Sequence, residues 1–264
     1  MKRFIVPTDF SINAQHASAY AVQLARQLSA SITLMHAYEA PVPVSEYEIG
    51  SLHFEAMKGE IIDRLNERKL ELEQEFGKEV PIDTVVFNDN LIDNIKKLYG
   101  DPEAKLAVIG LTGAGMVNFF LGSNTLNIVN SVGRIVLTVP PYAEFRPIRK
   151  VVFACDMWNV AVTVPAERIK RIMTLLNAEL LVLNIQKPQA PSPEAEAEKE
   201  TLEQMLKGIP FSFHAIKKRN IIAAIKDFAK EQQADLIAII PRKYDFLENL
   251  LRTNHTKAML FKSG

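Results

Sequence analysis

The sequence is poor in cysteine and in long apolar runs, and it carries no excess charge of either sign. Its 264 residues include one cysteine, Cys155, which excludes an internal disulfide. No apolar run approaches the roughly 20 residues that span a bilayer, and the N-terminus has no apolar stretch of signal-peptide length. The 31 Lys and Arg residues balance the 31 Asp and Glu residues, whereas nucleic-acid binders usually carry a basic excess. We therefore expect a soluble cytoplasmic protein with no membrane or nucleic-acid partner.

Apolar residues, in contrast, are plentiful. They make up 48% of the chain, and with a net charge of zero this excludes disorder for most of it. A chain of 264 residues is long enough for one large domain or two ordinary ones.

An internal repeat decides between these two possibilities. A short apolar run closed by an aspartate occurs near the N-terminus and again 147 residues later, and two further pairs of segments match at an offset of 130. The drop of 17 in the offset predicts that the second copy has lost residues from its middle, in the region of one helix. The matched positions are Asp9 and Asp156, Asn90 and Asn220, and Ala104 and Ala234. We expect one repeat at residues 1–140 and a second at residues 149–264, joined by a linker that contains Pro140 and Pro147.

Strand and helix patterns alternate within each repeat. Phe4-Ile5-Val6 is a continuous apolar run typical of a buried parallel strand, and apolar residues at helical spacing follow it, with Ser11 as a suitable N-cap. The alternation predicts an α/β fold with two doubly wound, Rossmann-like parallel-sheet repeats. Residues 135–139 form the expected fifth strand of the first repeat. At an offset of 130 this strand maps past Gly264, so we expect the second repeat to be degenerate and to lack a clear last strand.

A glycine-rich segment follows the fourth predicted strand. It contains Gly110, Gly113 and the pair Gly122-Ser123, which precedes a helical pattern. Glycines directly after a strand allow backbone to approach a ligand closely, and the positive end of the helix favours a phosphate.

These features together resemble the universal stress protein family. The resemblance rests on Pro7-Thr8-Asp9-Phe10-Ser11, on His36-Ala37 and on the glycine segment, and it implies a tandem two-repeat form. In nucleotide-binding members the pattern is G-x2-G-x9-G-[ST]. The aspartate after strand one and the residue after strand two hold the adenosine, while the glycine loop wraps the phosphates. For an adenine nucleotide (ATP, ADP or AMP), the resemblance implies a site at Asp9, Ala37, Ile109, Gly110, Gly113, Gly122 and Ser123.

The loop departs from this pattern in both repeats. Eight residues, rather than nine, separate Gly113 from Gly122, which either tightens the phosphate cradle or closes it. In the second repeat the three glycine positions carry Ile240, Lys243 and Arg252, so we expect that repeat to be structural. Its basic residues, with Arg242, are either exposed charges or a patch for an anion or an acidic surface.

Two single residues have more than one interpretation. Asp9 either bonds a ligand or caps the following helix, and its local chemistry favours neither. Cys155, at the end of an apolar strand, fits a small buried hydrophobe better than a nucleophile.

Catalysis and metal binding have little support in the residues. The histidines have no partner at i, i+4, and the sequence offers no general base or metal-binding carboxylate near the glycine loop. We expect a non-enzymatic stress-response protein, at most a very slow ATPase, with no metal site. The alternative is a regulatory or dimerisation scaffold that binds no nucleotide.

The fifth predicted strand is relevant to how the repeats, or two chains, associate. Family members join through this strand, and the resemblance therefore implies that the two repeats pair with each other. An unpaired edge at residues 135–139 is also a template for a second chain, so a homodimer stays open.

Overall fold

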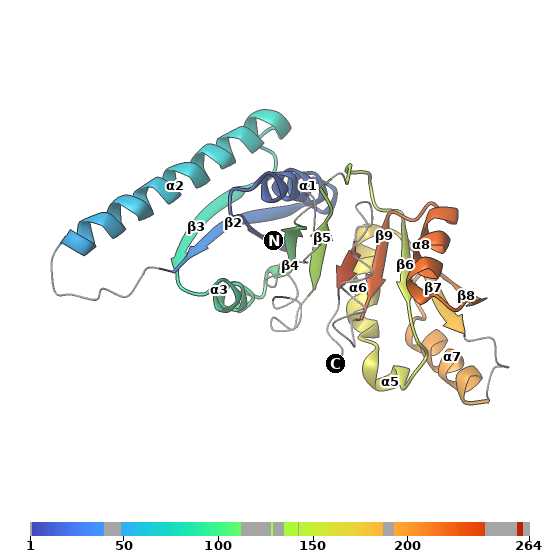
Figure 1. Cartoon of the computed structure of the whole chain (residues 1–264). Helices are drawn as coiled ribbons and strands as arrows, with labels where there is room; N and C mark the ends of the chain where they lie inside the picture. The colour runs from blue at the N-terminus through green and yellow to red at the C-terminus, as the bar shows by residue number, and fades with distance from the viewer. Residues whose placement is uncertain are drawn as a thin grey trace.

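The computed structural model describes residues 2–39, 49–111, 128, 135–141, 143–186, 193–240 and 258–260. Within this part of the chain, ten strands form one continuous sheet in the order β3-β2-β1-β4-β5-β10-β9-β6-β7-β8 (Figure 1). The strands are β1 (Lys2–Pro7), β2 (Ala30–Tyr38), β3 (Ile82–Asn88), β4 (Ala104–Gly110), β5 (Val136–Val139), β6 (Lys150–Ala154), β7 (Glu179–Gln186), β8 (Phe211–Lys217), β9 (Leu236–Ile239) and β10 (Ala258–Leu260).

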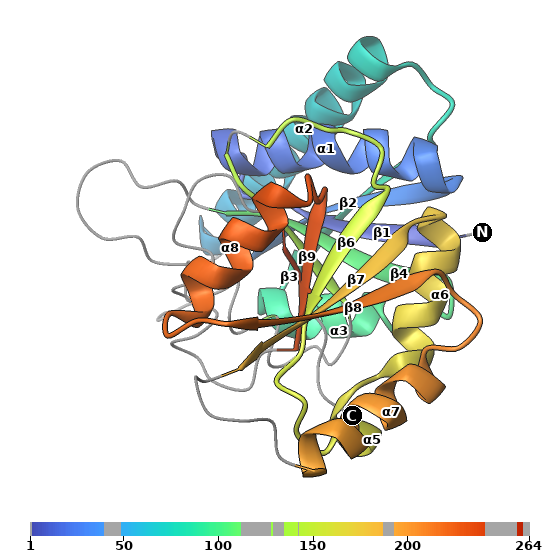
Figure 2. The same cartoon turned by 90° about the vertical axis from the view of Figure 1, so that its right-hand side faces the viewer.

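Helices cover both faces of this sheet, which confirms the two doubly wound repeats. The described helices are α1 (Ile12–Leu28), α2 (Ile49–Phe76), α3 (Leu91–Leu98), α5 (Val160–Thr163), α6 (Ala166–Leu176), α7 (Pro193–Met205) and α8 (Ile221–Glu231). One buried cluster packs α1, α2, α6 and α7 against one face, and a second packs α3 and α8 against the other. Figure 2 shows the second half from its own side, with α8 on one side of β6 and β9 and with α6 and α7 on the other.

The alternation of strand residues explains this layering. Phe4 and Val6 of β1 belong to the first cluster, whereas Ile5 between them belongs to the second, because successive strand side chains point to opposite faces. Helix α1 begins where predicted, since the Ser11 side chain accepts a hydrogen bond from the Ala14 N–H at 3.3 Å.

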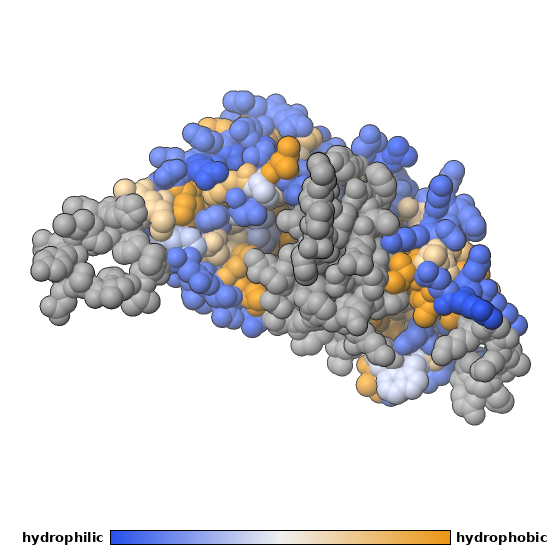
Figure 3. All heavy atoms as spheres, in the orientation of Figure 1, coloured by the Kyte–Doolittle hydropathy of each residue, from blue (hydrophilic) through white to orange (hydrophobic). Residues whose placement is uncertain are grey.

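The loss of residues in the second repeat falls on one helix, as predicted. Helix α2 has 28 residues, and its counterpart α7 has 13. Two buried leucines, Leu65 and Leu72, fix α2 to the core, and its outward surface is mostly hydrophilic (Figure 3).

The expectation that the second repeat lacks a clear last strand is corrected by β10. This strand is only three residues long and runs parallel to β9, as β5 runs parallel to β4. Ala107 pairs with Val136 in the first half and Ile237 pairs with Ala258 in the second, so the intervening segment is eight residues shorter in the second half. A constant offset of 130 therefore placed this strand beyond the end of the sequence.

Strands β5 and β10 join the two halves in antiparallel pairing. Leu137 pairs with Met259, and the residues on either side pair in turn. Leu137 and Met259 hold equivalent positions in their repeats, so the pairing has a local twofold symmetry centred on them. The edge of β5 that we expected to be open to a neighbour is occupied by this strand.

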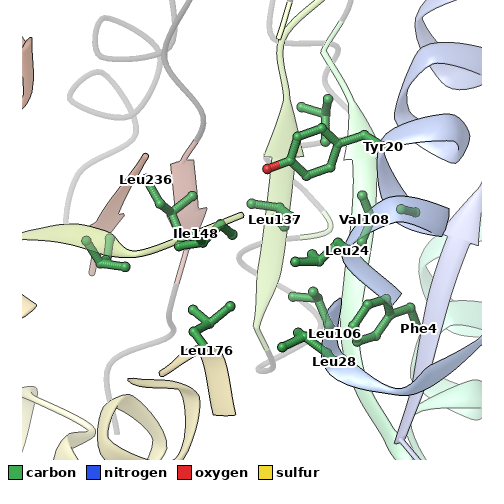
Figure 4. Close-up of a cluster of buried hydrophobic side chains, with 14 of the residues drawn as sticks. Phe4, Tyr20, Leu24, Leu28, Leu106, Val108, Leu137, Ile148, Leu176 and Leu236 are labelled. Carbon is green, nitrogen blue, oxygen red and sulfur yellow. The ribbon is translucent and has the colours of Figure 1, made fainter. Parts of the chain in front are cut away.

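Apolar side chains from both halves meet beside this junction. Leu24 of α1, Leu137 of β5, Ile148 of the linker, Leu176 of α6 and Leu236 of β9 belong to one buried cluster (Figure 4). The linker residue Ile148 has no exposed surface. Burial of a side chain of this size stabilises the fold by roughly 1.5–3 kcal/mol, so the linker contributes to the core.

Helix α1 packs so closely on the end of β4 that one position there must be glycine. A Cβ atom on Gly110 would overlap the carbonyl oxygen of Asn13 and would lie 2.8 Å from its carbonyl carbon. Both are backbone atoms of the first turn of α1, so they can move only if the helix moves.

We predict that Gly110→Ala destabilises the protein by about 1–3 kcal/mol, because the added methyl group pushes α1 away from β4. Gly59→Ala is the matched control, since a Cβ there meets nothing within 4 Å and alanine is favoured in the interior of helix α2. Urea denaturation should show a loss of stability for the first variant and a gain of about 0.5–1 kcal/mol for the second. Equal midpoints for Gly110→Ala and the parent protein would contradict this packing.

A second prediction concerns Tyr20. Its ring packs edge to face against the ring of the linker residue Phe145, and the two ring centres lie 5.2 Å apart. Burial raises the pKa of the Tyr20 phenol, and the nearby Asp235 carboxylate raises this pKa further. The unfolded phenol ionises near pH 10 while the folded one stays protonated. Its contribution to stability is therefore present below pH 10 and is lost as the pH rises above it.

The stability of the parent protein should fall above pH 10 by up to about 1.4 kcal/mol per pH unit from this residue alone. Tyr20→Phe should lack that component, whatever the other tyrosines contribute. Denaturation measured between pH 9 and 11 tests this, and identical slopes for the two proteins would refute it.

Candidate functional site

The described residues of the predicted nucleotide site lie at the carboxyl edge of the first half of the sheet. Strand β1 lies between β2 and β4, and all three are parallel. The structure therefore brings Asp9, Ala37, Ile109 and Gly110 to the same edge. The change of strand order beside β1 makes this the place where open α/β sheets usually bind ligands.

Asp9 has a structural role that does not exclude a ligand. Its Oδ1 accepts a hydrogen bond from the Ser11 N–H at 3.0 Å, so it shapes the turn that leads into α1. Asp9 is exposed to solvent. The N-cap of α1 is Ser11, so the interpretation that Asp9 itself caps this helix is wrong, and its role in ligand binding stays a prediction.

An aromatic and cationic cluster lies beside Asp9. The Phe10 ring stacks on His36 at 4.8 Å, and the Arg64 guanidinium lies 4.1 Å from the centre of the Phe10 ring. Stacking and cation–π attraction hold these side chains together. Sequence reasoning missed Arg64, because it comes from α2 and no local pattern connects it with Asp9.

The remaining predicted residues differ in how they are placed. Ala37 is half-buried in β2, opposite Phe87 of β3, whereas the Ile109 side chain is buried in the core. Gly110 contacts the first turn of α1, and this packing alone accounts for its missing side chain. Gly113, Gly122 and Ser123 lie outside the described residues.

The second half repeats the turn that carries the aspartate. In the first half, a ring nitrogen of His36 lies 2.7 Å from the Thr8 carbonyl oxygen. In the second half, the Asn184 side-chain amide donates to the Cys155 carbonyl at 3.0 Å. Two residues on from these carbonyls, the backbone is left-handed in both halves, with φ of 63° at Phe10 and 54° at the equivalent Met157. The turn is thus common to the two repeats and is independent of the glycine loop.

A pocket of about 260 Å³ lies at the carboxyl edge of the second half. Apart from the exposed Asp156, the described side chains that line it are apolar. They come from the ends of β6, β7 and β9, from helix α8 and from the segment after β6. The lining residues are Phe153, Ala154, Cys155, Asp156, Val164, Leu183, Ile185, Ile221, Ile225, Ile239 and Ile240. Sequence reasoning assigned no site here, and Arg242, Lys243 and Arg252 of the suggested basic patch lie outside the described residues.

Other features of the described residues concern metals, the cysteine and membranes. They contain no group of three or more His, Cys, Asp or Glu side chains placed to hold a metal ion. Cys155 is buried, in accordance with a small hydrophobe. Among the helices that the structure describes, none combines the length and apolar character needed to cross a bilayer.

The fold is shared with solved structures along the whole chain. A universal stress protein from Archaeoglobus fulgidus DSM 4304 matches with a TM-score of 0.72 at 14% identity, covering 99% of this chain and 98% of that one. A protein of unknown function from Pseudomonas aeruginosa PAO1 matches with a TM-score of 0.59 at 17% identity, covering 100% and 93%. The cytoplasmic domain of a prokaryotic cation chloride cotransporter matches with a TM-score of 0.57 at 10% identity, covering 98% and 94%.

At these identities the structures show a common fold. Curated protein sequences give no match. The profile of the universal stress protein family matches residues 1–140, which is more than half of the chain and includes Asp9, Ala37 and the glycine segment. The chain therefore belongs to the universal stress protein family.

Proposed function

We propose that this stress protein binds an adenine nucleotide (ATP, ADP or AMP) in its first repeat, while the second repeat is structural with respect to that nucleotide. The observation that carries the proposal is the convergence of Asp9, Ala37 and Gly110 at one carboxyl edge, inside the region that the family profile matches. The proposed domains are residues 1–140 and 149–264.

Each group at this edge suits one part of a nucleotide. The exposed Asp9 carboxylate is an acceptor for the ribose hydroxyls, and the small side chain of Ala37 leaves room for the base at the end of β2. The proposed phosphate ligands are the backbone of Gly113 and Gly122 and the hydroxyl of Ser123. Arg64, whose guanidinium lies over the ring of Phe10 next to Asp9, adds a positive charge near this edge.

We further propose that binding serves signalling rather than turnover, with ATP hydrolysis very slow at most. In this proposal no metal ion is needed, and the protein acts in the cytoplasm, where a chain with a single cysteine is suited to reducing conditions.

Association is the other part of the proposal. We propose that the two repeats form, within one chain, the paired unit that single-repeat relatives reach by dimerising. The twofold register of β5 and β10 supports this. A homodimer of whole chains would then need a surface other than the edge of β5, since β10 occupies that edge.

One observation favours the alternative of a regulatory scaffold that binds no nucleotide. The contact between Gly110 and Asn13 explains this glycine through packing, so the residue does not require a ligand. Calorimetry separates the two functions.

Isothermal titration with ATP, ADP and AMP should show one binding site per chain. Asp9→Asn should weaken binding at least about tenfold, because it removes a charged acceptor worth roughly 1.5–3 kcal/mol. The substitution keeps the Oδ1 acceptor for the Ser11 N–H, so the helix start should survive. Asp156→Asn is the matched control at the equivalent turn of the second half and should leave the affinity unchanged.

No heat from any of the three nucleotides at millimolar protein would refute the nucleotide proposal and favour the scaffold. Equal losses in Asp9→Asn and Asp156→Asn would show that the site is not confined to the first repeat.

A further inference from the structure

We propose that the pocket at the carboxyl ends of β6, β7 and β9 is a second binding site, which takes a small apolar molecule that is neutral or positively charged. The site lies in the repeat that has lost the glycine positions, and it does not rest on nucleotide binding in the first half.

The pocket exists because the chain after β6 follows a different path from the chain after β1. Helix α1 begins five residues after β1 ends and lays its first turn on β4. Helix α6 begins only at Ala166, twelve residues after β6 ends. Pro165 precedes it and cannot supply the backbone N–H that would continue α5 into α6.

Helix α7 holds the intervening segment. The Glu198 carboxylate accepts hydrogen bonds from the backbone N–H groups of Asn159 at 3.0 Å and Val160 at 2.7 Å. This pair of bonds to an ionised acceptor fixes α5 against α7. Helix α5, which corresponds to the first turn of α1, therefore packs against α7. Ile240 occupies the position in the second half that corresponds to Gly110 in the first.

The size and lining of the pocket define the class of ligand. Its volume of about 260 Å³ exceeds that of a Leu-, Ile- and Phe-lined cavity of roughly 150 Å³ that binds benzene. Branched aliphatic side chains dominate the wall, including Leu183, Ile225 and Ile239. An apolar two-ring compound or a short acyl chain fits such a wall, whereas the polar edge of a purine would lose hydrogen bonds to water without replacement there.

The charge of one lining residue restricts the class of ligand further. Among the described residues that line the pocket, Asp156 is the only charged one. The bond from Asn184 to the Cys155 carbonyl fixes the turn that carries it, so the carboxylate is positioned before a ligand arrives. A negative group on the ligand would lie close to this carboxylate, and the two like charges would repel each other.

Ile221 marks the mouth of the pocket. It is the first residue of α8, lines the pocket and is 45% exposed. The Asn220 side chain caps this helix by accepting from the Ala223 N–H at 3.0 Å. An aspartate at position 221 would therefore suit the helix start while placing a charge at the entrance.

The test compares two fluorescent probes that differ by one sulfonate group. N-phenyl-1-naphthylamine is neutral, and 8-anilino-1-naphthalenesulfonate is its anionic analogue. The neutral probe should bind at one saturable site per chain, at least about tenfold more tightly than the anionic one. Ile221→Asp should weaken the neutral probe at least about tenfold, and Asp156→Asn should strengthen the anionic probe without weakening the neutral one.

Ile62→Asp is the matched control, because Ile62 is 39% exposed and lies on α2 in the other half of the molecule. It should leave both affinities unchanged, and circular dichroism should show all three variants folded. The proposal is overturned if the neutral probe does not saturate, if Ile62→Asp weakens it as much as Ile221→Asp, or if the sulfonate binds the parent protein more tightly.

Discussion

The antiparallel pairing of β5 with β10 is the interaction on which the arrangement of the whole molecule depends. It converts two parallel sheets into one and leaves β3 and β8 as its outer strands. Because every other described pair of strands is parallel, the reversal at this junction turns the carboxyl ends of the two halves to opposite edges of the sheet. The nucleotide site that we propose and the apolar pocket therefore lie at opposite edges.

The short strand pairing is supported by packing on one side of it. Three residue pairs alone make a weak ladder, but Leu137, Ile148 and Leu176 are buried together beside it. The linker also bonds the first half, since the Ile148 N–H donates to Gln27 at 3.3 Å, and the next residue, Arg149, is held in the second half by donating its N–H to Asp235 at 2.8 Å. The junction is consequently part of the core rather than a flexible connection between domains.

The carboxyl edges of the two repeats share one turn but differ in the path of the chain that follows it. Both keep the aspartate turn and the side chain that holds it, so these belong to the fold itself. They differ in where the next helix starts. In the first half α1 closes on Gly110, whereas in the second half Glu198 holds α5 against α7 and space remains over Ile240. The loss of the glycine and the presence of the pocket therefore go together with a different chain path after the first strand of the repeat.

Sequence reasoning succeeded where the signal is local and periodic. Short continuous apolar runs predicted the strands, and Ser11 predicted the start of α1. The change in the offset between the two repeats predicted the shorter α7. It missed β10, because a three-residue strand has too little pattern to reveal that eight residues are absent before it. It also missed the stacking of Arg64 on Phe10, since the two residues are joined only by tertiary packing.

The pocket could not be predicted from the sequence either, because only tertiary packing brings its lining residues together. Val164 and Ile221 line it together, although 56 residues separate them in the sequence, and each alone resembles an ordinary core residue. Glu198, whose carboxylate holds α5 against α7, is one glutamate among several in an acidic helix. Neither spacing nor composition distinguishes it.

If the two repeats carry separate sites of different chemistry, a nucleotide and an apolar molecule should bind at the same time. Calorimetric titration of ATP into the protein saturated with N-phenyl-1-naphthylamine, with probe fluorescence followed in parallel, measures both sites in one sample. We expect the same nucleotide affinity with and without the probe, and unchanged probe fluorescence as ATP saturates. Displacement of the probe by ATP would place both ligands in one site and refute the presence of two separate sites.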